Sequence, residues 1–406
     1  MSKRTSRRPA LRGLVARFFS ITLGAVVASA LIVALQLPLL HERPRVHFAL
    51  NSYASFNYTP PPLVWPSQGS AALDVPDLGI TRTWHNQVVP IASLTKMMTV
   101  YVALKKFPLS FGQTGPCVVV TSAEVLTYQQ DKLAHDSSVA VALGEQLCEI
   151  DLLNGALVHS AANYADILAS MVSATPEAFV ARMNETASSL GLRHTHYADD
   201  SGISSQSVST ALDQAKLAVI LMRSPLVRSI VDQSTVDLPV AGYVNSFTPM
   251  VGLNDVVGVK SGRTSAAGGC DVMAVDYLLN GRRHLVYAVV LGQRGGDVLA
   301  AAGVAAFALA ASAETSQVDV AFSKGAVLGT IGYGKDVVPF GLAHESHVYW
   351  WDQHNVHPLH VRLRHFGSTI HRGEIVGWIE VHSTQKPVPL VALRSLRAPT
   401  LWQRIL

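Results

Sequence analysis

Apolar residues follow three successive patterns along this chain: one long run, then mixed helical and strand periods, then short alternating runs. The long run covers Phe18–Leu40, and its only polar members are Ser20, Thr22, Ser29 and Gln36. Roughly 20 apolar residues span a bilayer core, so this run predicts a transmembrane helix over residues 18–40. Six Lys or Arg residues lie within residues 1–17. The positive-inside rule then predicts a cytoplasmic basic segment there, with the rest of the chain on the extracytoplasmic side of the cell membrane.

A cleaved signal peptide is the alternative, because Ala28-Ser29-Ala30 fits the small-residue pattern of a cleavage site. The apolar core of a signal peptide is usually about 7–15 residues long, whereas this run continues past Ala30. We therefore expect an uncleaved, single-pass signal anchor. Residues 41–64 follow with repeated prolines and no hydrophobic period, which predicts an extended proline-rich linker.

Residues 65–315 combine helical and strand periods and predict an α/β domain. A hairpin is expected within residues 67–84, and a mostly buried helix over Ser93–Lys106. Further helices are expected over residues 152–173, 176–190, 213–223 and 299–311, and strands over 256–260, 270–275 and 284–292. The last two strands are joined by Asn280-Gly281, a tight-turn signal. Short alternating runs separated by glycine fill residues 316–406, which predicts a small all-β domain.

Composition supports folded cores and gives no sign of a nucleic-acid partner. Apolar residues make up 49% of the chain and charged residues 15%, which excludes a disordered protein. The net charge is +4, and the basic segment at residues 1–17 contributes to it, so the remainder is close to neutral. Nucleic-acid-binding domains are usually much more basic.

The three cysteines suit an exported protein that is not a disulfide scaffold. Cys117 opens an apolar run, and Cys148 follows the apolar run at residues 139–143. If these runs pair as a hairpin, a Cys117–Cys148 disulfide is compatible with the geometry, and two free thiols are the alternative. Cys270 lies in a predicted strand and is expected to be a buried free thiol.

The segment Ser93-Leu94-Thr95-Lys96 carries the first candidate chemistry. Residues three apart on a helix share a face, so Lys96 should lie beside the Ser93 hydroxyl. A lysine among apolar neighbours has a lowered pKa and can act as the base that serine needs as a nucleophile. The purely structural alternative is an N-cap serine followed by a lysine that reaches solvent. The motif alone is weak, because about one Ser-x-x-Lys is expected by chance in a chain of this composition.

The segment Lys260-Ser261-Gly262 is the second candidate. A cation and a hydroxyl at a strand edge can bind a substrate carboxylate, and a glycine there lets a substrate backbone approach closely. The structural alternative is a strand that runs into a turn with a solvated lysine.

Together these segments resemble the serine D-alanyl-D-alanine carboxypeptidases, the low-molecular-mass penicillin-binding proteins. The resemblance covers about residues 65–310. It rests on residues 90–99 around Ser93, residues 152–165, residues 200–202 with 209–213, and residues 258–270. Residues 372–377 and 388–392 also resemble the family's membrane-proximal β-domain. The resemblance implies a penicillin-binding-protein/β-lactamase-like transpeptidase domain, an antiparallel sheet flanked by helices, followed by the all-β domain.

The resemblance also implies a role for each site residue. Ser93 would attack the bond between the two terminal D-alanines of a peptidoglycan stem peptide, Lys96 would take its proton, and Ser160 would relay protons to the leaving amine. The backbone N–H groups of Ser93 and Arg263 would form an oxyanion hole. Lys260 and Ser261 would orient the terminal carboxylate beside Gly262. β-Lactams would inhibit, and neither a metal nor a cofactor is implied.

The second motif departs from the family pattern Ser-x-Asn. Two residues after Ser160 the chain has Ala162, and Asn163 is one position too late. Neighbouring residues on a helix point about 100° apart, so Asn163 does not simply substitute. A weakened enzyme and a non-catalytic binding homologue in the cell wall both remain open. A β-lactamase is a further alternative, but the chain lacks a Glu-x-x-x-Asn segment in the expected context between Ser160 and Lys260.

Histidines at positions 354, 357 and 360 raise the possibility of a zinc site. Pro358 excludes a helix there, and on a strand residues three apart lie on opposite faces. We expect surface histidines and no metal centre.

Overall fold

The computed structural model describes Ser29 and residues 44–48, 62–279, 282–351, 360–365, 369–380 and 387–397. The predicted anchor over residues 18–40, apart from Ser29, lies outside these ranges. So do the predicted Asn280-Gly281 turn and the candidate zinc residues His354 and His357. The described residues contain no group of three or more His, Cys, Asp or Glu that could hold a metal.

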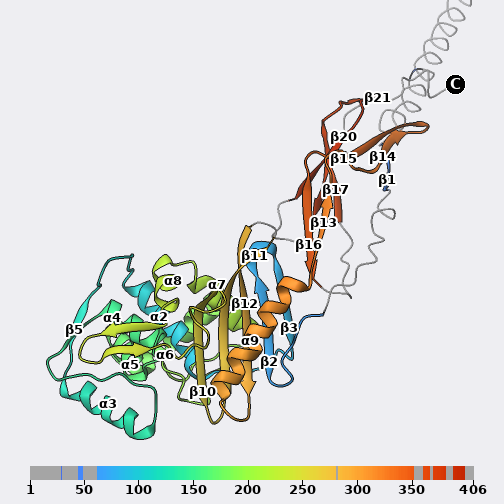
Figure 1. Ribbon diagram of the computed structural model, residues 1–406. Helices are drawn as coiled ribbons and strands as arrows, with labels where there is room; N and C mark the ends of the chain where they lie inside the picture. Colours follow the sequence, from blue (N-terminus) through green and yellow to red (C-terminus); the bar gives the residue numbers. More distant parts are fainter. Residues whose placement is uncertain are drawn as a thin grey trace, which may run out of the picture.

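A five-stranded antiparallel sheet forms the centre of the larger domain, in the order β10-β11-β12-β2-β3 (Figure 1). Its strands are β2 (Ser70–Val75), β3 (Ile80–Trp84), β10 (Val256–Thr264), β11 (Gly268–Leu279) and β12 (Arg282–Gln293). The predicted hairpin and the three predicted strands are therefore confirmed, each of those three strands being longer than expected. β10 lies at an edge of this sheet, which leaves one side of its backbone free to pair with an extended peptide.

The two faces of this sheet have separate hydrophobic cores. Alternate residues of β11 divide between them: Cys270 and Val272 face the helical lobe, while Met273 and Val275 face helix α9 (Val298–Thr315). Cys270 is a buried free thiol, as predicted. Within the described ranges, α9 is the one helix with the length and hydropathy of a membrane span. It packs on β11 and β12 and buries Ala306, Leu309 and Ala310, so it is a core helix.

A lobe of helices covers the other face of the sheet (Figure 1). They are α2 (Lys96–Lys106), α3 (Ser122–Ala134), α4 (Glu149–Leu157), α5 (Ala162–Val172), α6 (Pro176–Ser189), α7 (Ala211–Leu221) and α8 (Pro225–Val231), with the 3-10 turn η3 (Ala92–Thr95). A second 3-10 turn, η2 (Pro76–Leu78), joins β2 to β3 on the α9 side. The sequence analysis did not predict α3, in which no residue is buried and the hydrophobic period is weak. Short ribbons β4 (Val89–Pro90) with β7 (Val208–Ser209), and β8 (Thr235–Leu238) with β9 (Gly242–Asn245), join these helices.

The prediction of one helical stretch over residues 152–173 was wrong, because the chain turns between α4 and α5. Ser160 has φ 63°, in the left-handed region that ends a helix. The Tyr164 ring of α5 packs directly on Gly155 of α4, where a Cβ would lie 2.3 Å from the ring. The Ala161 N–H donates to the Gly155 carbonyl at 2.9 Å and closes this turn. The break places Ser160 at a turn between two packed helices.

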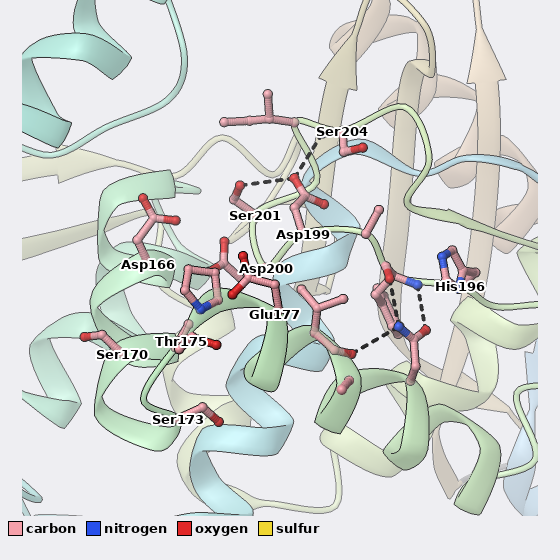
Figure 2. Close-up of a pocket in the computed structure, with 18 of the residues that line it drawn as sticks. Asp166, Ser170, Ser173, Thr175, Glu177, His196, Asp199, Asp200, Ser201 and Ser204 are labelled. Atoms are coloured by element: carbon pink, nitrogen blue, oxygen red, sulfur yellow. Dashed lines mark hydrogen bonds between the residues drawn. The ribbon is translucent and has the colours of Figure 1, made fainter.

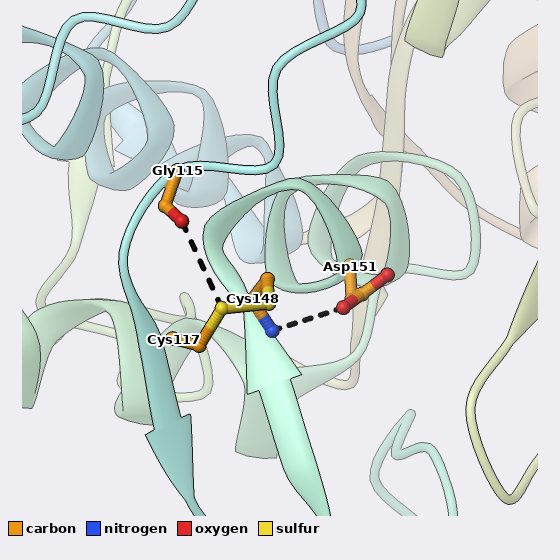
Figure 3. The surroundings of a disulfide bond; sticks show 4 residues. All are labelled: Gly115, Cys117, Cys148 and Asp151. Carbon is orange, nitrogen blue, oxygen red and sulfur yellow. Dashed lines mark hydrogen bonds between the residues drawn. A yellow bond between two sulfur atoms is a disulfide. The ribbon is translucent and has the colours of Figure 1, made fainter.

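A disulfide joins Cys117 and Cys148 (Figure 3). Cys117 opens β5 (Cys117–Val119), and Cys148 ends β6 (Gln146–Cys148), directly opposite it in the ladder. The predicted pairing strand at residues 139–143 was wrong: that segment is irregular, and β6 takes its place. Cys148 also precedes α4, and its N–H donates to the Asp151 carboxylate at 2.9 Å. The disulfide therefore fixes the start of the helix that leads to Ser160.

After α9, every element that the structure describes is a strand, as predicted. These are β13 (Gln317–Phe322), β14 (Val327–Tyr333), β15 (Asp336–Leu342), β16 (Ser346–Trp351), β17 (His360–Leu363), β18 (Thr369–Ile370), β19 (Ile375–Glu380), β20 (Val388–Ala392) and β21 (Leu396–Arg397). The main sheet has the order β1-β14-β15-β20-β19-β17, with a core around Phe340 and Leu390. Its first strand, β1 (Arg45–Phe48), comes from the predicted linker. That part of the linker is thus a strand of the β-domain, and not an extended stalk.

Candidate active site

The turn η3 presents Ser93 at the start of α2 and places Lys96 directly beneath it. Ser93 is half-buried, and Lys96 is 1% exposed. Lys96 Nζ lies 2.9 Å from Ser93 Oγ and 2.7 Å from the Ser201 carbonyl oxygen, and it is hydrogen-bonded to both. Ala92, just before the serine, has φ 48° and is buried. The strained turn holds the hydroxyl accessible while the amine stays out of water.

Burial changes the chemistry of Lys96. It lowers the pKa of this lysine to about 8, although nearby carboxylates, Asp200 first and then Asp166, Asp199 and Asp136, act in the opposite direction. A lysine with this pKa is partly neutral near pH 7, and its lone pair can take the Ser93 proton over the 2.9 Å contact. The pair therefore has the geometry and the protonation that serine acyl transfer needs.

The loop over residues 199–207 positions the second partner of Lys96 (Figure 2). The Asp199 carboxylate accepts hydrogen bonds from the Ser204 N–H at 2.9 Å and from the Ser207 hydroxyl. Gly202 has φ 82°, and a Cβ there would lie 1.9 Å from the Ala92 carbonyl oxygen. Only glycine allows this contact between the loop and the nucleophile turn. The resemblance identified residues 200–202 but not the role of the Ser201 carbonyl.

An acidic cavity lies on the far side of this loop, between α5, α6 and residues 196–204 (Figure 2). Its volume is about 960 Å³. Asp166 and Asp200 meet there and interact through a side-chain hydrogen bond, and burial raises the pKa of both carboxyls. This pair is close enough to Lys96 to influence its charge.

The edge strand β10 approaches the nucleophile at Gly262. A Cβ on Gly262 would lie 2.6 Å from the Ser93 backbone nitrogen, so a larger residue does not fit. The adjacent Arg263 is exposed. The backbone of β10 and the Ser93 N–H thus meet at one point, where an oxyanion hole would require them.

Lys260 and Ser261 are both buried on β10, at 0% and 1% exposure. Burial and the positive charge of Lys96 lower the pKa of Lys260 well below its usual value. The Ser261 hydroxyl donates to the Phe247 carbonyl at 2.7 Å, so it would have to rotate to bind a substrate carboxylate. Asp271, opposite Ser261 in the ladder, is fully buried and favours the charged form of Lys260. The sequence analysis did not identify Asp271, although a carboxylate inside an apolar strand was a visible signal.

Ser160 and Asn163, in and beside the second motif, make no hydrogen bond to Lys96 in the part of the chain that the structure describes. Ser160 is buried, and its segment is tied to the third motif through Phe247, whose N–H donates to the Val158 carbonyl at 3.0 Å. Asn163 makes two hydrogen bonds to the backbone of Val139, accepting at 3.0 Å and donating at 2.8 Å. The Ala162 N–H donates to the Ser137 carbonyl at 2.7 Å. Asn163 is therefore a scaffold residue, and it does not take the place of the missing asparagine.

The structure thus brings Ser93, Lys96 and Gly262 into direct contact and places Lys260 within electrostatic reach of Lys96. No hydrogen bond of Lys96 reaches Ser160 within the described ranges, since those it makes go to Ser93 and Ser201. A serine–lysine pair beside the edge strand of a helix-flanked antiparallel sheet is the arrangement of penicillin-binding serine acyltransferases.

Comparison with known proteins identifies the family. Residues 80–295, just over half of the chain, match the family model for D-alanyl-D-alanine carboxypeptidase, peptidase S11, and the chain belongs to this family. A D-alanyl-D-alanine endopeptidase of Pseudomonas aeruginosa is 32% identical over 197 residues, which are 46% of this chain and 59% of that protein. The corresponding Escherichia coli endopeptidase is 29% identical over 229 residues, 51% of this chain and 67% of that protein. The chain thus spans about three fifths to two thirds of the length of these relatives.

Solved structures agree on the fold. The D-alanyl-D-alanine carboxypeptidase of Francisella tularensis superposes with a TM-score of 0.58 at 18% identity, covering 86% of this chain and 98% of that chain. The predicted α/β, penicillin-binding-protein-like fold is confirmed.

Proposed function

We propose that this protein is a serine D,D-carboxypeptidase that removes the terminal D-alanine from peptidoglycan stem peptides through an acyl-enzyme on Ser93. The observation that carries the proposal is the 2.9 Å contact between Ser93 Oγ and the buried Lys96 amine, beside the close approach of Gly262. A solvated lysine after an N-cap serine would have an ordinary pKa, whereas burial lowers the pKa of Lys96 to about 8.

The reaction follows from these contacts. Ser93 Oγ attacks the carbonyl carbon between the two D-alanines and gives its proton to Lys96 Nζ. The backbone N–H groups of Ser93 and Arg263 stabilise the oxyanion. The carbon–nitrogen bond then breaks, and the proton taken up by Lys96 passes through Ser160 to the leaving D-alanine amine, which restores the neutral lysine. Water hydrolyses the ester, releases the shortened peptide and restores the Ser93 hydroxyl.

The terminal carboxylate is assigned to Lys260 and Ser261, next to Gly262. A bound anion would favour the charged form of Lys260, whose pKa is lowered by burial. The Ser261 hydroxyl would exchange the Phe247 carbonyl for the substrate. β-Lactams would acylate Ser93 in the same way as the peptide.

A peptidoglycan enzyme works outside the cytoplasm, in the periplasm or at the outer face of the cell membrane. We assign residues 18–40 as its single-pass anchor and residues 1–17 as the cytoplasmic segment, on hydropathy and charge. The catalytic domain then covers residues 65–315 and the β-domain residues 316–406. The segment between anchor and catalytic domain, residues 41–64, adds the strand β1 to the β-domain.

A D,D-endopeptidase is the second candidate, because two curated relatives carry that name. The chemistry at Ser93 would be the same, and only the leaving group would differ: a cross-linked peptide in place of free D-alanine.

One set of measurements tests these alternatives. The full chain in detergent is mixed with benzylpenicillin and followed by intact mass, with Ser93→Ala as the control. A one-to-one adduct that requires Ser93 is expected, together with D-alanine release from a stem pentapeptide. Cleavage of cross-linked dimers in preference to pentapeptides would favour the endopeptidase. Absence of both adduct and turnover would overturn the enzyme assignment in favour of a binding homologue.

A further inference from the structure

The Cys117–Cys148 disulfide links the loop after the nucleophile helix to the helix that leads to Ser160 (Figure 3). This loop, residues 107–116, is irregular and mostly exposed, and it follows α2, whose first residue is Lys96. Cys148 is the N-cap residue of α4. One covalent bond therefore ties together the helices of both candidate catalytic serines, and the mechanism above does not use it.

Apart from the disulfide, backbone hydrogen bonds hold this loop against the start of α4. The Glu149 N–H donates to the Pro116 carbonyl at 2.8 Å. The Ile150 N–H donates to the Thr114 carbonyl at 3.0 Å. The strands β5 and β6 pair in a short ribbon that is separate from the central sheet. A ribbon of two short strands is only marginally stable by itself, so we expect the cross-link to supply much of its stability.

A buried carboxyl beneath the loop opposes this arrangement. Glu149 is 0% exposed, and among the described residues neither oxygen of its carboxyl has a hydrogen-bond partner. A Cβ on Gly115 would lie 2.5 Å from Glu149 Oε2, so the loop lies directly on the carboxyl. Burial raises the pKa of Glu149 from its ordinary value of 4.5 to about 7. The cost of keeping the carboxyl protonated is therefore absent below pH 4.5 and grows up to about pH 7, so at neutral pH it favours opening of the loop to water.

The two sulfur atoms differ in accessibility and as leaving groups. Cys117 is exposed, whereas Cys148 is half-buried, so an incoming thiolate reaches Cys117 first. A thiolate on Cys148 would lie at the N-terminus of α4, where the helix dipole stabilises negative charge. Attack on Cys117 with Cys148 as the leaving group is therefore the favoured direction of thiol–disulfide exchange.

A change at the start of α4 reaches the active site by two routes. The helix packs on α2, and its residues Leu152 and Leu153 are fully buried. Beyond its end, the Val158 carbonyl accepts a hydrogen bond from the Phe247 N–H at 3.0 Å. The Phe247 carbonyl in turn accepts from the Ser261 hydroxyl at 2.7 Å. A shift of α4 would therefore be transmitted both to the nucleophile helix and to β10.

We propose that the Cys117–Cys148 disulfide is a regulatory site, at which reduction by a dithiol releases the loop from α4 and slows acylation of Ser93. The effect on acylation rests on the proposed function. One thiolate of the dithiol attacks Cys117 Sγ, the bond between the two cysteines breaks, and Cys148 leaves as a thiolate. The second thiolate of the dithiol then attacks the mixed disulfide and displaces Cys117. The dithiol is oxidised to a disulfide, and its two protons pass through solvent to the two reduced cysteines.

The test takes the full chain in detergent through a series of ratios of reduced to oxidised dithiothreitol at neutral pH. Maleimide labelling of the native protein should reveal two new thiols, because Cys270 is buried. Hydrogen exchange should rise at residues 107–121 and 146–153 and stay unchanged in α9. The rate of acylation by benzylpenicillin should fall about five- to tenfold over the same series. A disulfide that resists reduction until the chain unfolds, or reduction that changes neither exchange nor acylation, would overturn the proposal.

Cysteine variants separate this disulfide from other effects of the reductant. The double variant Cys117→Ser, Cys148→Ser should acylate at the low rate at every ratio. Cys270→Ala is the matched control and should respond as the unaltered chain does, since it removes the one described cysteine outside the disulfide. A double variant that still responds to dithiothreitol would overturn the assignment of the switch to this bond.

Glu149→Gln tests the buried carboxyl, because an amide of the same size does not ionise. Reduction should slow acylation less in this variant than in the unaltered chain. Glu145→Gln is its control, since the Glu145 carboxylate already accepts a hydrogen bond, from the Ala142 N–H at 2.8 Å. Equal losses in all three proteins would overturn the part assigned to Glu149.

The exchange measurement also separates this proposal from the proposed function. Absence of acylation in both redox states would contradict the carboxypeptidase. Increased exchange at residues 92–96 on reduction would in that case still support the switch, and unchanged exchange there would overturn it.

Discussion

Two turns carry the predicted serines, Ser93 and Ser160, and they use their polar groups in opposite ways. In the nucleophile turn, residues 92–96, the side chains of Ser93 and Lys96 face each other, and the surrounding structure positions them through glycines. In the second turn, residues 158–163, Asn163 bonds the backbone of Val139, and Ser160 is buried without a bond to Lys96. The first turn places two reactive side chains in contact, whereas the side chain of Asn163 in the second turn stabilises the backbone of a neighbouring segment.

The difference shows which parts of a site tolerate change. The nucleophile turn depends on backbone contacts at Gly202 and Gly262 that leave no space for a side chain. The second turn contributes through the hydrogen bonds of Asn163 to the Val139 backbone, and Asn163 lies one position after the place of the asparagine in the family pattern. We therefore expect steep losses in the first turn and moderate ones in the second.

The largest effect should come from Lys96→Ala, with a loss of acylation rate of about 10²- to 10⁴-fold. In the unaltered enzyme, the neutral amine is the reactive form, and its pKa is about 8. The acylation rate should therefore rise about tenfold per pH unit up to about pH 8 and then level off. Stopped-flow acylation by a chromogenic β-lactam measures this profile. A rate independent of pH between 6 and 8 would contradict Lys96 as the base.

Gly202→Ala should have the second-largest effect, a loss of kcat/KM of about 10²-fold. Its Cβ would collide with the Ala92 carbonyl and displace the nucleophile turn. The control is Gly191→Ala. Gly191 also has a positive φ, 72°, but no atom lies within 4 Å of a Cβ there. It should lower stability by about 1–2 kcal/mol and leave kcat/KM nearly intact. Equal losses of activity in both variants would refute the contact argument.

Ser160→Ala should lower turnover by about tenfold, a smaller loss, because the serine is assigned to the leaving amine and not to the attack. The amine leaves as the acyl-enzyme forms, so the adduct with benzylpenicillin should still form but more slowly, as intact mass over time will show. An unchanged rate of adduct formation would contradict the role of Ser160 at the leaving amine, and complete loss of the adduct would remove the contrast between the two turns.

Asn163→Ala should have its main effect on stability, with a decrease of about 2–4 kcal/mol in the free energy of unfolding, because it leaves the buried backbone groups of Val139 unpaired. Asn184 makes the same pair of bonds to Tyr197, at 2.9 and 2.8 Å, and Asn184→Ala is its counterpart. Urea denaturation compares the two.

The sequence predicted what depends on local spacing. Ser93 and Lys96 are three residues apart, the strand periods of residues 256–292 are regular, and the resemblance supplied the order of the motifs. It did not predict contacts between distant segments, such as the Ser201 carbonyl at Lys96 or the Val139 backbone at Asn163. The sequence analysis also predicted one helix where the structure has α4 and α5. A single residue with a positive φ, Ser160, ends the first helix without changing the spacing of the apolar residues.

Under the proposed assignment of residues 18–40 as the anchor, the pairing of β1 with β14 decides where the chain leaves the bilayer. Strand β1 lies beside β14 in the sheet of the β-domain, apart from the helices of the catalytic domain (Figure 1). With residues 18–40 as the anchor, the chain leaves the bilayer beside the β-domain and not beside Ser93. The β-domain is then a spacer of fixed length, and the nucleophile reaches peptidoglycan at a set height above the lipid surface.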